Sequence, residues 1–433
     1  VSNFVVESVP DNFSTLYTHA NFLKVGNTLA ALQQLTTCHR KAFEIPIVGI
    51  TGSNGKTMVK EWLSQLLAYD KNVTRSPKSY NSQIGVPLSV WLLNESSQIG
   101  LIEAGISKVG EMQALHDIIQ PTVGVLTSLG AAHQENFSSL EEKCNEKLLL
   151  FKGTQALVYQ LDDEIAAKCI SAAHYDGKLL AWSEHDTTAA FFVDRIEKSD
   201  TASTVSYIWQ HATHGSFTLP FIDEASVSNC ITCAVVALHF GILPDVLAQR
   251  MATLEPVAMR LEVKEGQHGC TLINDSYNSD INSLDIALDF MNRRPDQKRR
   301  ERTLILSDIY QSGETEQQLY ADVAALVKKR GVKKFIGIGT ALGRQQQAFE
   351  GLETKFFFDN IADFIGSKVF KSLHDEVILL KGARSFGFDK LTELLVKKVH
   401  ETVLEVNLNA VVDNLNWYRS FLKPETKLVC MIK

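Results

Sequence analysis

The amino-acid sequence predicts an α/β fold in which parallel sheets form two consecutive domains. Short β-branched runs alternate with amphipathic stretches of helical period, between about residues 43 and 161 and again from residue 303 onward. A glycine-rich turn also joins one of these strands to the following helix. Strands separated by helices in this way pair in parallel.

The first of these domains is expected to begin with regularly alternating elements. Strands are expected at residues 45–50, 99–103, 122–126 and 156–159, and helices at 56–69, 110–118 and 139–150. Alternation at 204–209 and 216–221 then indicates an antiparallel insertion or subdomain. A helix at 227–240 and a hairpin of 261–264 with 271–274 are expected to follow.

A smaller, Rossmann-like α/β domain is expected further along the chain. Strand-like runs at 303–306, 334–337 and 377–380 alternate with helical stretches there. The basic segment 293–302 precedes it, and a solvated linker is favoured over a nucleic-acid patch because the whole chain is acidic. The predicted parts are a truncated N-terminal domain at 1–43, a central P-loop domain at 44–296, the C-terminal α/β domain at 297–400 and a further segment at 401–433.

Composition and charge exclude several classes of protein. Hydrophobic residues make up 45% and charged residues 21%, as in ordinary globular proteins. The net charge of −7 argues against electrostatic capture of nucleic acid. No apolar run approaches the ~20 residues of a membrane span, and seven thinly spread cysteines fit a reducing cytoplasm. Cys230 and Cys233 have metal-site spacing but are interpreted as core thiols of a helix.

The segment Gly49–Thr57 predicts a site for nucleotide phosphates. Its glycines can direct several backbone N–H groups toward phosphate oxygens, beside a helix N-terminus. Lys56 is expected to contact the β- and γ-phosphates, and the Thr57 hydroxyl to coordinate Mg²⁺. The strict pattern requires a glycine five residues before Gly55, where Ile50 stands, so this loop departs from the common form.

The departing loop, Thr51-Gly-Ser-Asn-Gly-Lys-Thr57, resembles that of the Mur ligase family, ATP-dependent enzymes that join amino acids to the peptidoglycan precursor. Further stretches resemble, in family order, the branch that adds D-alanyl-D-alanine to UDP-N-acetylmuramoyl-tripeptide. These stretches are Asn81 to Pro87, Ile102 to Ser107, Leu129 to His133, Arg260 to Lys264, Asn274 to Asn278 and Lys381 to Arg384. Agreement of so many ordered motifs is more specific than the loop alone.

The resemblance implies two Mg²⁺ sites. Glu103, which ends a predicted strand, would bind one ion beside Thr57, and His133 would hold the second. Lys147 matches the lysine that CO₂ carbamylates in the family, which turns a cation into an anionic metal ligand. This chemistry requires an unprotonated amine and therefore a lowered pKa. Without the resemblance, Glu103 reads equally well as an ion-pair partner, His133 as a loop histidine and Lys147 as a surface residue.

The same resemblance implies how ATP would be held. It assigns Asn229 to the adenine, Arg260 to the γ-phosphate and Asp275 to the ribose, with Tyr277 and Asn278 near the far wall. The loop residues implied to bind the nucleotide are Gly52, Ser53, Asn54, Gly55, Lys56 and Thr57. The chain departs from the family pattern at Ser128, at Ala225 and Ser226, and at Asp280 and Ile281.

Both ends of the sequence are expected to continue into something longer. Stretches at 3–10 and 28–34 resemble the last part of the family's N-terminal domain, which grips the UDP-sugar. Stretches at 404–415 and 427–433 resemble the opening of alanine racemase, in which the residue matching Lys433 forms the Schiff base with pyridoxal phosphate. The sequence ends on that lysine, so racemisation is not expected of this chain, and a fused racemase domain is expected in its parent.

The function implied is amide-bond formation through an acyl phosphate, at the expense of ATP. The catalytic residues implied are Lys56, His133, Lys147 and Arg260. Two alternatives stay open. The chain could be another ligase of the superfamily, such as one acting on folate, or a nucleotide-binding fragment without ligation activity.

Overall fold

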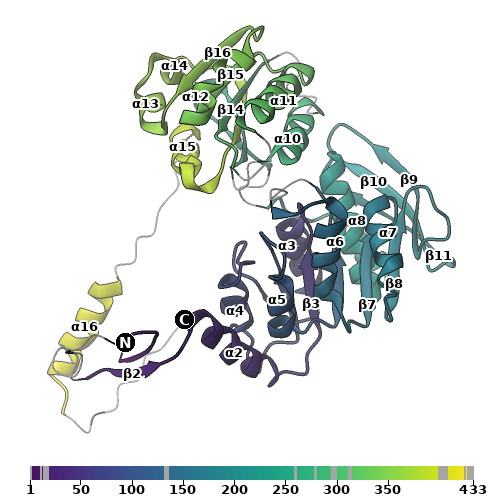
Figure 1. The fold of residues 1–433 in the computed structure, drawn as a ribbon, viewed down its shortest axis with the longest axis vertical. Coiled ribbons are helices and arrows are strands. Elements are labelled where there is room, and N and C mark those ends of the chain that lie inside the picture. The colour runs from purple at the N-terminus through teal and green to yellow at the C-terminus, as the bar shows by residue number, and fades with distance from the viewer. Residues whose placement is uncertain are drawn as a thin grey trace. The chain divides into compact units, whose positions relative to one another are not determined.

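Two parallel-rich sheets carry most of the described chain (Figure 1). The computed structural model describes residues 2–9, 12, 19–130, 136–257, 261–276, 280–293, 300–310, 315–397, 408–423 and 426. Residues 1–396 form one unit by their internal contacts, and residues 397–433 form a second. Both sheets lie within the first unit.

Among the described residues, nine strands form the first sheet, in the order β11-β10-β9-β8-β7-β6-β3-β5-β4. Their bounds are β3 Ile47–Thr51, β4 Val73–Arg75, β5 Ile99–Glu103, β6 Val123–Leu126, β7 Ala156–Gln160, β8 Lys178–Ser183, β9 Phe191–Lys198, β10 Ser203–Trp209 and β11 Thr213–Leu219. Pairing is parallel from β4 to β9 and antiparallel from β9 to β11. The four strands predicted first are therefore confirmed, with ends displaced by at most two residues.

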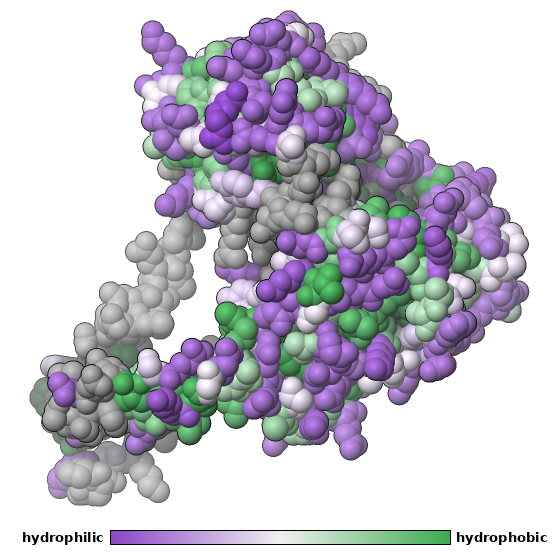
Figure 2. Space-filling view, in the orientation of Figure 1, coloured by the Kyte–Doolittle hydropathy of each residue, from purple (hydrophilic) through white to green (hydrophobic). Residues whose placement is uncertain are grey.

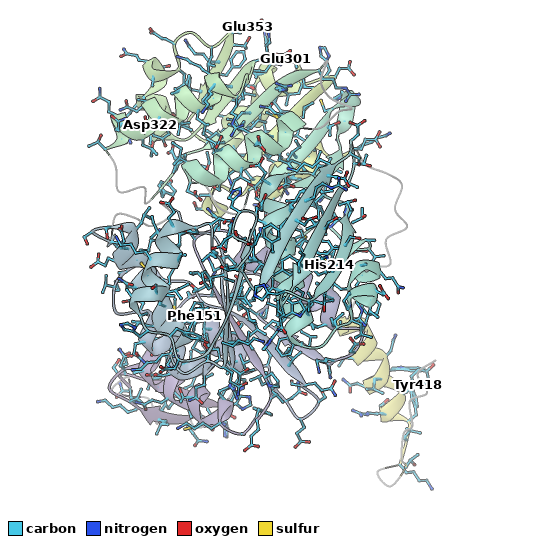
Figure 3. The ribbon with its side chains drawn as sticks, turned by 90° about the vertical axis from the view of Figure 1, so that its right-hand side faces the viewer. Phe151, His214, Glu301, Asp322, Glu353 and Tyr418 are labelled. Atoms are coloured by element: carbon cyan, nitrogen blue, oxygen red, sulfur yellow. The ribbon has the colours of Figure 1, made fainter. Side chains whose placement is uncertain are left out.

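Helices cover both faces of this sheet, as a doubly wound fold requires. Along β3, Val48 and Ile50 enter one core cluster while Ile47 enters the other, because successive side chains of a strand point to opposite faces. Phe151, labelled in Figure 3, packs under Gly124 so closely that a Cβ there would lie 2.4 Å from its ring. The helices are α3 Lys56–Leu67, α8 Glu224–His239 and α9 Pro244–Met251 on the first face, and α4 Gly85–Val90, α5 Met112–Ile119, α6 Leu140–Leu148 and α7 Glu164–Ala172 on the second.

The antiparallel strands are not a separate subdomain. We predicted an insertion between about residues 191 and 221, yet β9, β10 and β11 extend the edge of the first sheet. Their alternate residues, such as Val205 and Tyr207, are buried in the same cluster as α8 and α9. Burial of one face against these helices holds the ribbon on the sheet.

The second sheet contains six strands among the described residues, in the order β12-β13-β17-β14-β15-β16. The strands are β12 Glu262–Glu265, β13 Thr271–Asp275, β14 Glu301–Ser307, β15 Lys334–Ile338, β16 Thr354–Phe358 and β17 Glu376–Lys381. The helices are α10 Ile281–Arg293, α11 Glu316–Lys329 and α12 Thr340–Arg344 on one face, and α13 Ile361–Gly366, α14 Lys368–Lys371 and α15 Phe388–Leu395 on the other. The 3₁₀ turns are η2 Leu149–Phe151, η3 Gln267–Gly269, η5 Gln346–Phe349 and η6 Arg384–Phe386. The predicted strands at 303–306, 334–337 and 377–380 are confirmed.

The predicted hairpin forms, but in the other sheet. β12 and β13 pair antiparallel as expected, and β13 then pairs in parallel with β17, whereas we had included both strands in the 44–296 domain. The reason is that β13 is apolar on both faces: Leu272 and Ile273 enter opposite cores of the second sheet. The second sheet therefore begins before the basic segment rather than after it.

The ends of the chain contain smaller elements. β1 (Asn3–Val6) pairs in parallel with β2 (Asn21–Lys24), and α2 (Thr28–Arg40) follows. The guanidinium of Arg40, at the end of α2, donates to the carbonyl oxygen of Ile119 at 2.8 Å. In the second unit, α16 spans Leu408–Ser420.

Hydrophilic side chains cover much of the visible described surface (Figure 2). Within the described residues, no helix is long and apolar enough to cross a membrane.

Candidate active site

The glycine-rich loop lies between the end of β3 and the start of α3. Gly52 and Gly55 have φ values of +149° and +87°, which side-chain-bearing residues rarely adopt. A Cβ on Gly52 would lie 1.9 Å from Thr127 Oγ1, and one on Gly55 would lie 2.4 Å from Asn229 Oδ1. The N-cap residue of α3 is Gly55, which has no side chain to cap the first N–H groups of the helix, and N–H groups in this position can bind an anion.

The segment after β6 fixes the shape of this loop. The Ser53 N–H donates to the Ser128 carbonyl oxygen at 2.8 Å, and the Ser53 hydroxyl donates to the Gly130 carbonyl oxygen at 3.0 Å. The Thr127 hydroxyl donates to the Asn54 carbonyl oxygen at 2.6 Å. Ser128, one of the departures from the family pattern, therefore supports the loop through its backbone.

Three lysine side chains of the described chain contact the loop or the segment after β6 that supports it. Lys56 Nζ donates to the carbonyl oxygens of Gly52 and Ser53 at 2.8 and 2.9 Å. Lys147 Nζ donates to the Gly52 oxygen at 3.1 Å, and Lys143 Nζ donates to the Gly130 oxygen at 2.6 Å. Lys143 and Lys147 lie one helical turn apart on α6, and both are buried.

The positive charges of these lysines lower the pKa of their neighbours. Burial, followed by the charges of Lys56 and Lys143, holds the pKa of Lys147 well below the ordinary value of a lysine. Burial and the charge of Lys56 lower the pKa of Lys143 to about 8, although Asp280 opposes this shift. A site with this excess of positive charge favours a bound anion. Lys147 thus meets the requirement of a lowered pKa, and its carbamylation stays a prediction.

Lys143→Met is expected to stabilise the nucleotide-free protein by about 1–2 kcal/mol at pH 7. The pKa is about 8 in the folded state against 10.5 for an ordinary lysine, so the unfolded chain holds this proton more tightly. The lowered pKa therefore reduces the free energy of unfolding, and it does so by the full amount below the folded-state pKa. The reduction disappears as the pH rises to the pKa of the unfolded state. Thermal unfolding at several pH values measures the difference, with Lys168→Met, on the exposed side of α7, as the control. A variant that is no more stable than wild type at neutral pH would contradict the expectation.

A buried carboxylate lies beside the start of α3. Glu103, at the end of β5, is 0% exposed, and its Oε2 accepts from Thr57 Oγ1 at 3.2 Å and from Asn81 Nδ2 at 3.4 Å. The Thr57 hydroxyl also lies 2.9 Å from Ser79 Oγ. Hydroxyl and carboxylate oxygens are ligands that Mg²⁺ accepts, so Thr57 and Glu103 fit the ion that the sequence implied. The described residues hold no group of three or more His, Cys, Asp or Glu side chains that could bind a metal by themselves.

The residues predicted for adenine and ribose line one pocket of about 290 Å³ within the first unit. Asn54 and Gly55 of the loop, Asn229 of α8 and Asp275 of β13 all face it. Asp275 Oδ2 accepts from Lys381 Nζ at 2.7 Å, and both side chains are nearly buried. The structure therefore brings the predicted nucleotide residues together, while their individual contacts to ATP stay predictions.

Several predicted residues lie outside the described part of the chain. They are His133, Arg260, Tyr277, Asn278 and Lys433, together with the side chain of Arg384. The second predicted metal site therefore has only Lys147 among the described residues. As an amine it carries no negative charge for a metal, so this site depends on the carbamate.

Sequence reasoning missed three polar residues near the loop. Lys143 lies one helical turn before Lys147 on α6, and Lys60 lies one turn after Lys56 on α3. The third missed residue, Ser79, contacts Thr57 through its hydroxyl. The spacing of four residues between lysines was the available signal. It placed each pair on one helix face, but it did not indicate that this face is buried.

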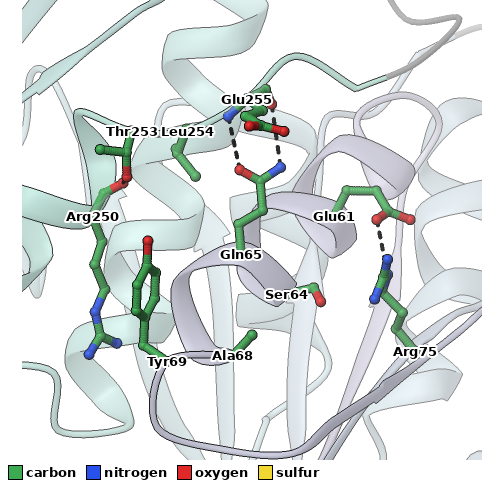
Figure 4. A pocket seen from close by; sticks show the side chains of 10 residues that line it. All are labelled: Glu61, Ser64, Gln65, Ala68, Tyr69, Arg75, Arg250, Thr253, Leu254 and Glu255. Carbon is green, nitrogen blue, oxygen red and sulfur yellow. Dashed lines mark hydrogen bonds and ion pairs between the residues drawn. The ribbon is translucent and has the colours of Figure 1, made fainter. Parts of the chain in front are cut away.

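A second pocket, of about 550 Å³, lies along α3 and near α9 (Figure 4). Its polar side chains pair with one another: Gln65 exchanges hydrogen bonds with the backbone of Glu255, and Arg75 donates to Glu61 at 3.0 Å. No predicted site residue is among the residues that line it. The first of these contacts attaches α3 to the segment after α9 and the second attaches it to β4, and the pocket is not part of the candidate site.

The cysteines of the pair at 230 and 233 are buried core thiols, as expected. Both lie inside α8, and Cys233 Sγ is 3.6 Å from the Val59 carbonyl oxygen. The described cysteines are all free.

A glycine-rich loop at the carboxyl end of a central parallel strand, followed by a helix with an uncapped N-terminus, defines a nucleotide-binding α/β protein of the P-loop class. Residues 50–237 match the family model of the Mur ligase middle domain.

Individual relatives extend this match beyond the middle domain. The chain is 25% identical over 398 residues to UDP-N-acetylmuramoyl-tripeptide--D-alanyl-D-alanine ligase of Bacillus subtilis (strain 168). This alignment covers 88% of the present chain and 82% of that ligase. Its fold is similar to a crystal structure of MurF from Acinetobacter baumannii, with a TM-score of 0.75, 19% identity and coverage of 90% of each chain. The MurF ligase of Thermotoga maritima in complex with ADP gives a TM-score of 0.74 at 18% identity, covering 90% of this chain and 93% of that one.

Proposed function

We propose that this chain is an ATP-dependent ligase that adds D-alanyl-D-alanine to UDP-N-acetylmuramoyl-tripeptide, a step in the synthesis of the peptidoglycan precursor. The observation that carries the proposal is the approach of Lys56 and Lys147 to the phosphate loop and of Lys143 to the supporting segment after β6, beside the oxygen groups of Thr57 and Glu103. The activity for which the Bacillus subtilis relative is named supports the choice of substrates.

In the proposed reaction, the terminal carboxylate of the tripeptide attacks the γ-phosphorus of ATP. The bond from that phosphorus to the bridging oxygen breaks, ADP leaves, and an acyl phosphate forms. The amine of D-alanyl-D-alanine then attacks the acyl carbon, inorganic phosphate leaves and the amine loses a proton. Lys56 and the N–H groups at the start of α3 would orient the phosphates and stabilise the charge that develops on the transferred group.

The metal ligands would act on the same phosphates. Bound Mg²⁺ supplies positive charge that neutralises phosphate oxygens during the transfer. Thr57 and Glu103 would hold it, and carbamylated Lys147, with His133, would hold a second ion. Arg260 would contact the γ-phosphate from outside the described residues.

A ligation assay with defined substrates tests this function. Purified protein would receive ATP, Mg²⁺ and UDP-N-acetylmuramoyl-tripeptide, with D-alanyl-D-alanine or another amino acid as acceptor. We expect phosphate release that depends on both substrates, ADP as the nucleotide product, and a mass gain of one dipeptide. Release of AMP would reject the acyl phosphate.

The same assay separates the two alternatives. Phosphate release that depends on folate and glutamate, or on a different acceptor amino acid, would assign the chain to another ligase of the superfamily. ATP binding without substrate-dependent phosphate release would identify a nucleotide-binding chain that does not ligate. The likeness of Asn274-Asp-Ser-Tyr-Asn278 to the D-alanyl-D-alanine branch favours the proposed function over another ligase of the superfamily.

We further propose that residues 404–433 open a racemase-like segment that belongs to a fused alanine racemase in the parent protein. The support is the sequence likeness alone, and within this segment the structure describes α16. Borohydride reduction of the native parent protein, followed by peptide mapping, is expected to find a pyridoxyl group on Lys433. An unlabelled Lys433 in a protein that binds pyridoxal phosphate elsewhere would reject this proposal. We also propose a cytoplasmic location, which the free described cysteines support.

A further inference from the structure

Lys60 is a fully buried lysine that none of the predicted roles uses. It lies on α3, one turn after Lys56, and its side chain is 0% exposed. Its Nζ donates to the Ser76 carbonyl oxygen at 2.8 Å and to the Lys78 carbonyl oxygen. A buried ammonium is costly unless it is paired and hydrogen-bonded, so these partners must account for its presence.

Two carboxylates balance the charge of Lys60. Its Nζ lies 3.0 Å from Glu103 Oε1 and 2.9 Å from Glu61 Oε1. Glu61 is partly exposed and also contacts Arg75, whereas the Glu103 side chain is 0% exposed. Because Glu103 Oε1 has no hydrogen-bond partner among the described residues, the ammonium is what compensates the charge on that oxygen.

The two oxygens of Glu103 therefore have different surroundings. Oε1 faces the ammonium of Lys60, and Oε2 faces the Thr57 hydroxyl and the Asn81 amide. A carboxylate that is held through one oxygen presents the other oxygen in a fixed direction. For Glu103 that direction is toward the Thr57 hydroxyl, which is expected to bind the same metal ion. Outer contacts of this kind orient ligands and tune their affinity for the ion.

Lys60 also fixes the segment that closes this side of the site. Its two carbonyl partners belong to Ser76 and Lys78, which come just before Ser79 in the chain. The Ser79 hydroxyl in turn contacts Thr57. Lys78 has a φ of +49°, an uncommon value for a residue with a side chain, and the ammonium holds its carbonyl in that arrangement. One lysine thus connects α3, the end of β5 and the Ser76–Asn81 segment.

We propose that Lys60 is the positioning residue of the metal-binding carboxylate: it holds Glu103 so that Oε2 faces the Mg²⁺ site, and it sets the affinity of that site for the metal. This inference rests on the proposed function, because it takes the ion bound by Thr57 and Glu103 as its object. In this role Lys60 would act through Glu103 and would not itself bind the metal.

Metal binding in the presence of ADP tests the inference without relying on ligation. Mn²⁺, used as a paramagnetic probe for the site, would be titrated into the protein–ADP complex and followed by its electron paramagnetic resonance signal. We expect Lys60→Met to weaken Mn²⁺ binding about 10–100-fold. Binding of fluorescent ADP without metal is expected to stay within about twofold of wild type, because the described contacts of Lys60 Nζ are with residues outside the phosphate loop. Lys168→Met, on the exposed side of α7, is the matched control.

A second variant separates positioning from a structural role. Lys60→Gln retains a hydrogen-bond donor for the carbonyls but removes the charge beside Glu103, so Mn²⁺ affinity is again expected to fall at least tenfold. If either variant has the wild-type circular dichroism spectrum and binds Mn²⁺ as tightly as wild type, the inference is overturned. If Lys60→Met does not fold, Lys60→Gln decides between the two outcomes. A wild-type ADP complex that binds no Mn²⁺ would instead overturn the proposed metal site itself.

Discussion

Lys56→Ala is expected to lower the rate of ADP formation by about 10³-fold while leaving the protein folded. The Lys56 ammonium lies 2.8 and 2.9 Å from two carbonyl oxygens of the phosphate loop, those of Gly52 and Ser53. A bound triphosphate would offer stronger, charged acceptors, so the ammonium would turn from its own loop toward the phosphates. Its contribution would be largest as charge develops on the transferred phosphoryl group.

Steady-state kinetics with varied ATP measures this loss. We expect kcat to fall more than the affinity for ADP, because ADP lacks the phosphate at which Lys56 acts most strongly. Lys152→Ala, an exposed lysine after η2, is the control and should retain wild-type kinetics. A Lys56→Ala protein that forms ADP within about tenfold of the wild-type rate would remove the lysine from the mechanism.

The fold could be predicted where the apolar residues of a segment follow a single period, that of a strand or that of a helix. β5 was placed at its observed bounds, and the strand, turn and helix around Lys56 were placed almost as well, because β-branched runs, glycines and an amphipathic helix agree there. The membership of β13 could not be predicted in this way. Its partner β17 is about a hundred residues away, and a local pattern does not state which sheet a doubly apolar strand joins.

The site was predictable only in its parts that are local in sequence. The loop and Thr57 follow from spacing, whereas Glu103, Asn229 and Asp275 required the family resemblance to bring them to one place. Lys60 and Lys143 were missed because a lysine on a helix is ordinarily a surface residue. Their burial depends on β5 and on the segment after β6, whose approach to α3 and α6 is a tertiary feature.

The proposed roles of the three lysines near the loop require different charge states, and the arrangement of the lysines is compatible with both. Lys56 and Lys143 would serve as cations toward phosphate, but Lys147 must be neutral before it can react with CO₂. The charges of the first two contribute to lowering the pKa of the third, after its burial. The cationic cluster that would attract ATP would therefore also favour the proposed carbamylation of Lys147, and the resulting negative charge would reduce the repulsion within the cluster.

Lys147→Ala is expected to lower the ligation rate by about 10²–10³-fold and to abolish a carbamate signal in the ¹³C NMR spectrum of protein equilibrated with ¹³C-labelled bicarbonate. The wild-type Lys147 Nζ is buried and donates to the Gly52 carbonyl oxygen at 3.1 Å, and its lowered pKa makes its neutral form easier to reach than that of an ordinary lysine. As the pH falls through that lowered pKa, the amine gains a proton, the carbamate is lost and activity should decline. Added bicarbonate should move the decline to lower pH in wild type but not in the variant. Lys152→Ala should keep both the signal and the rate, whereas a Lys147→Ala protein that ligates at the wild-type rate would remove the carbamate from the mechanism.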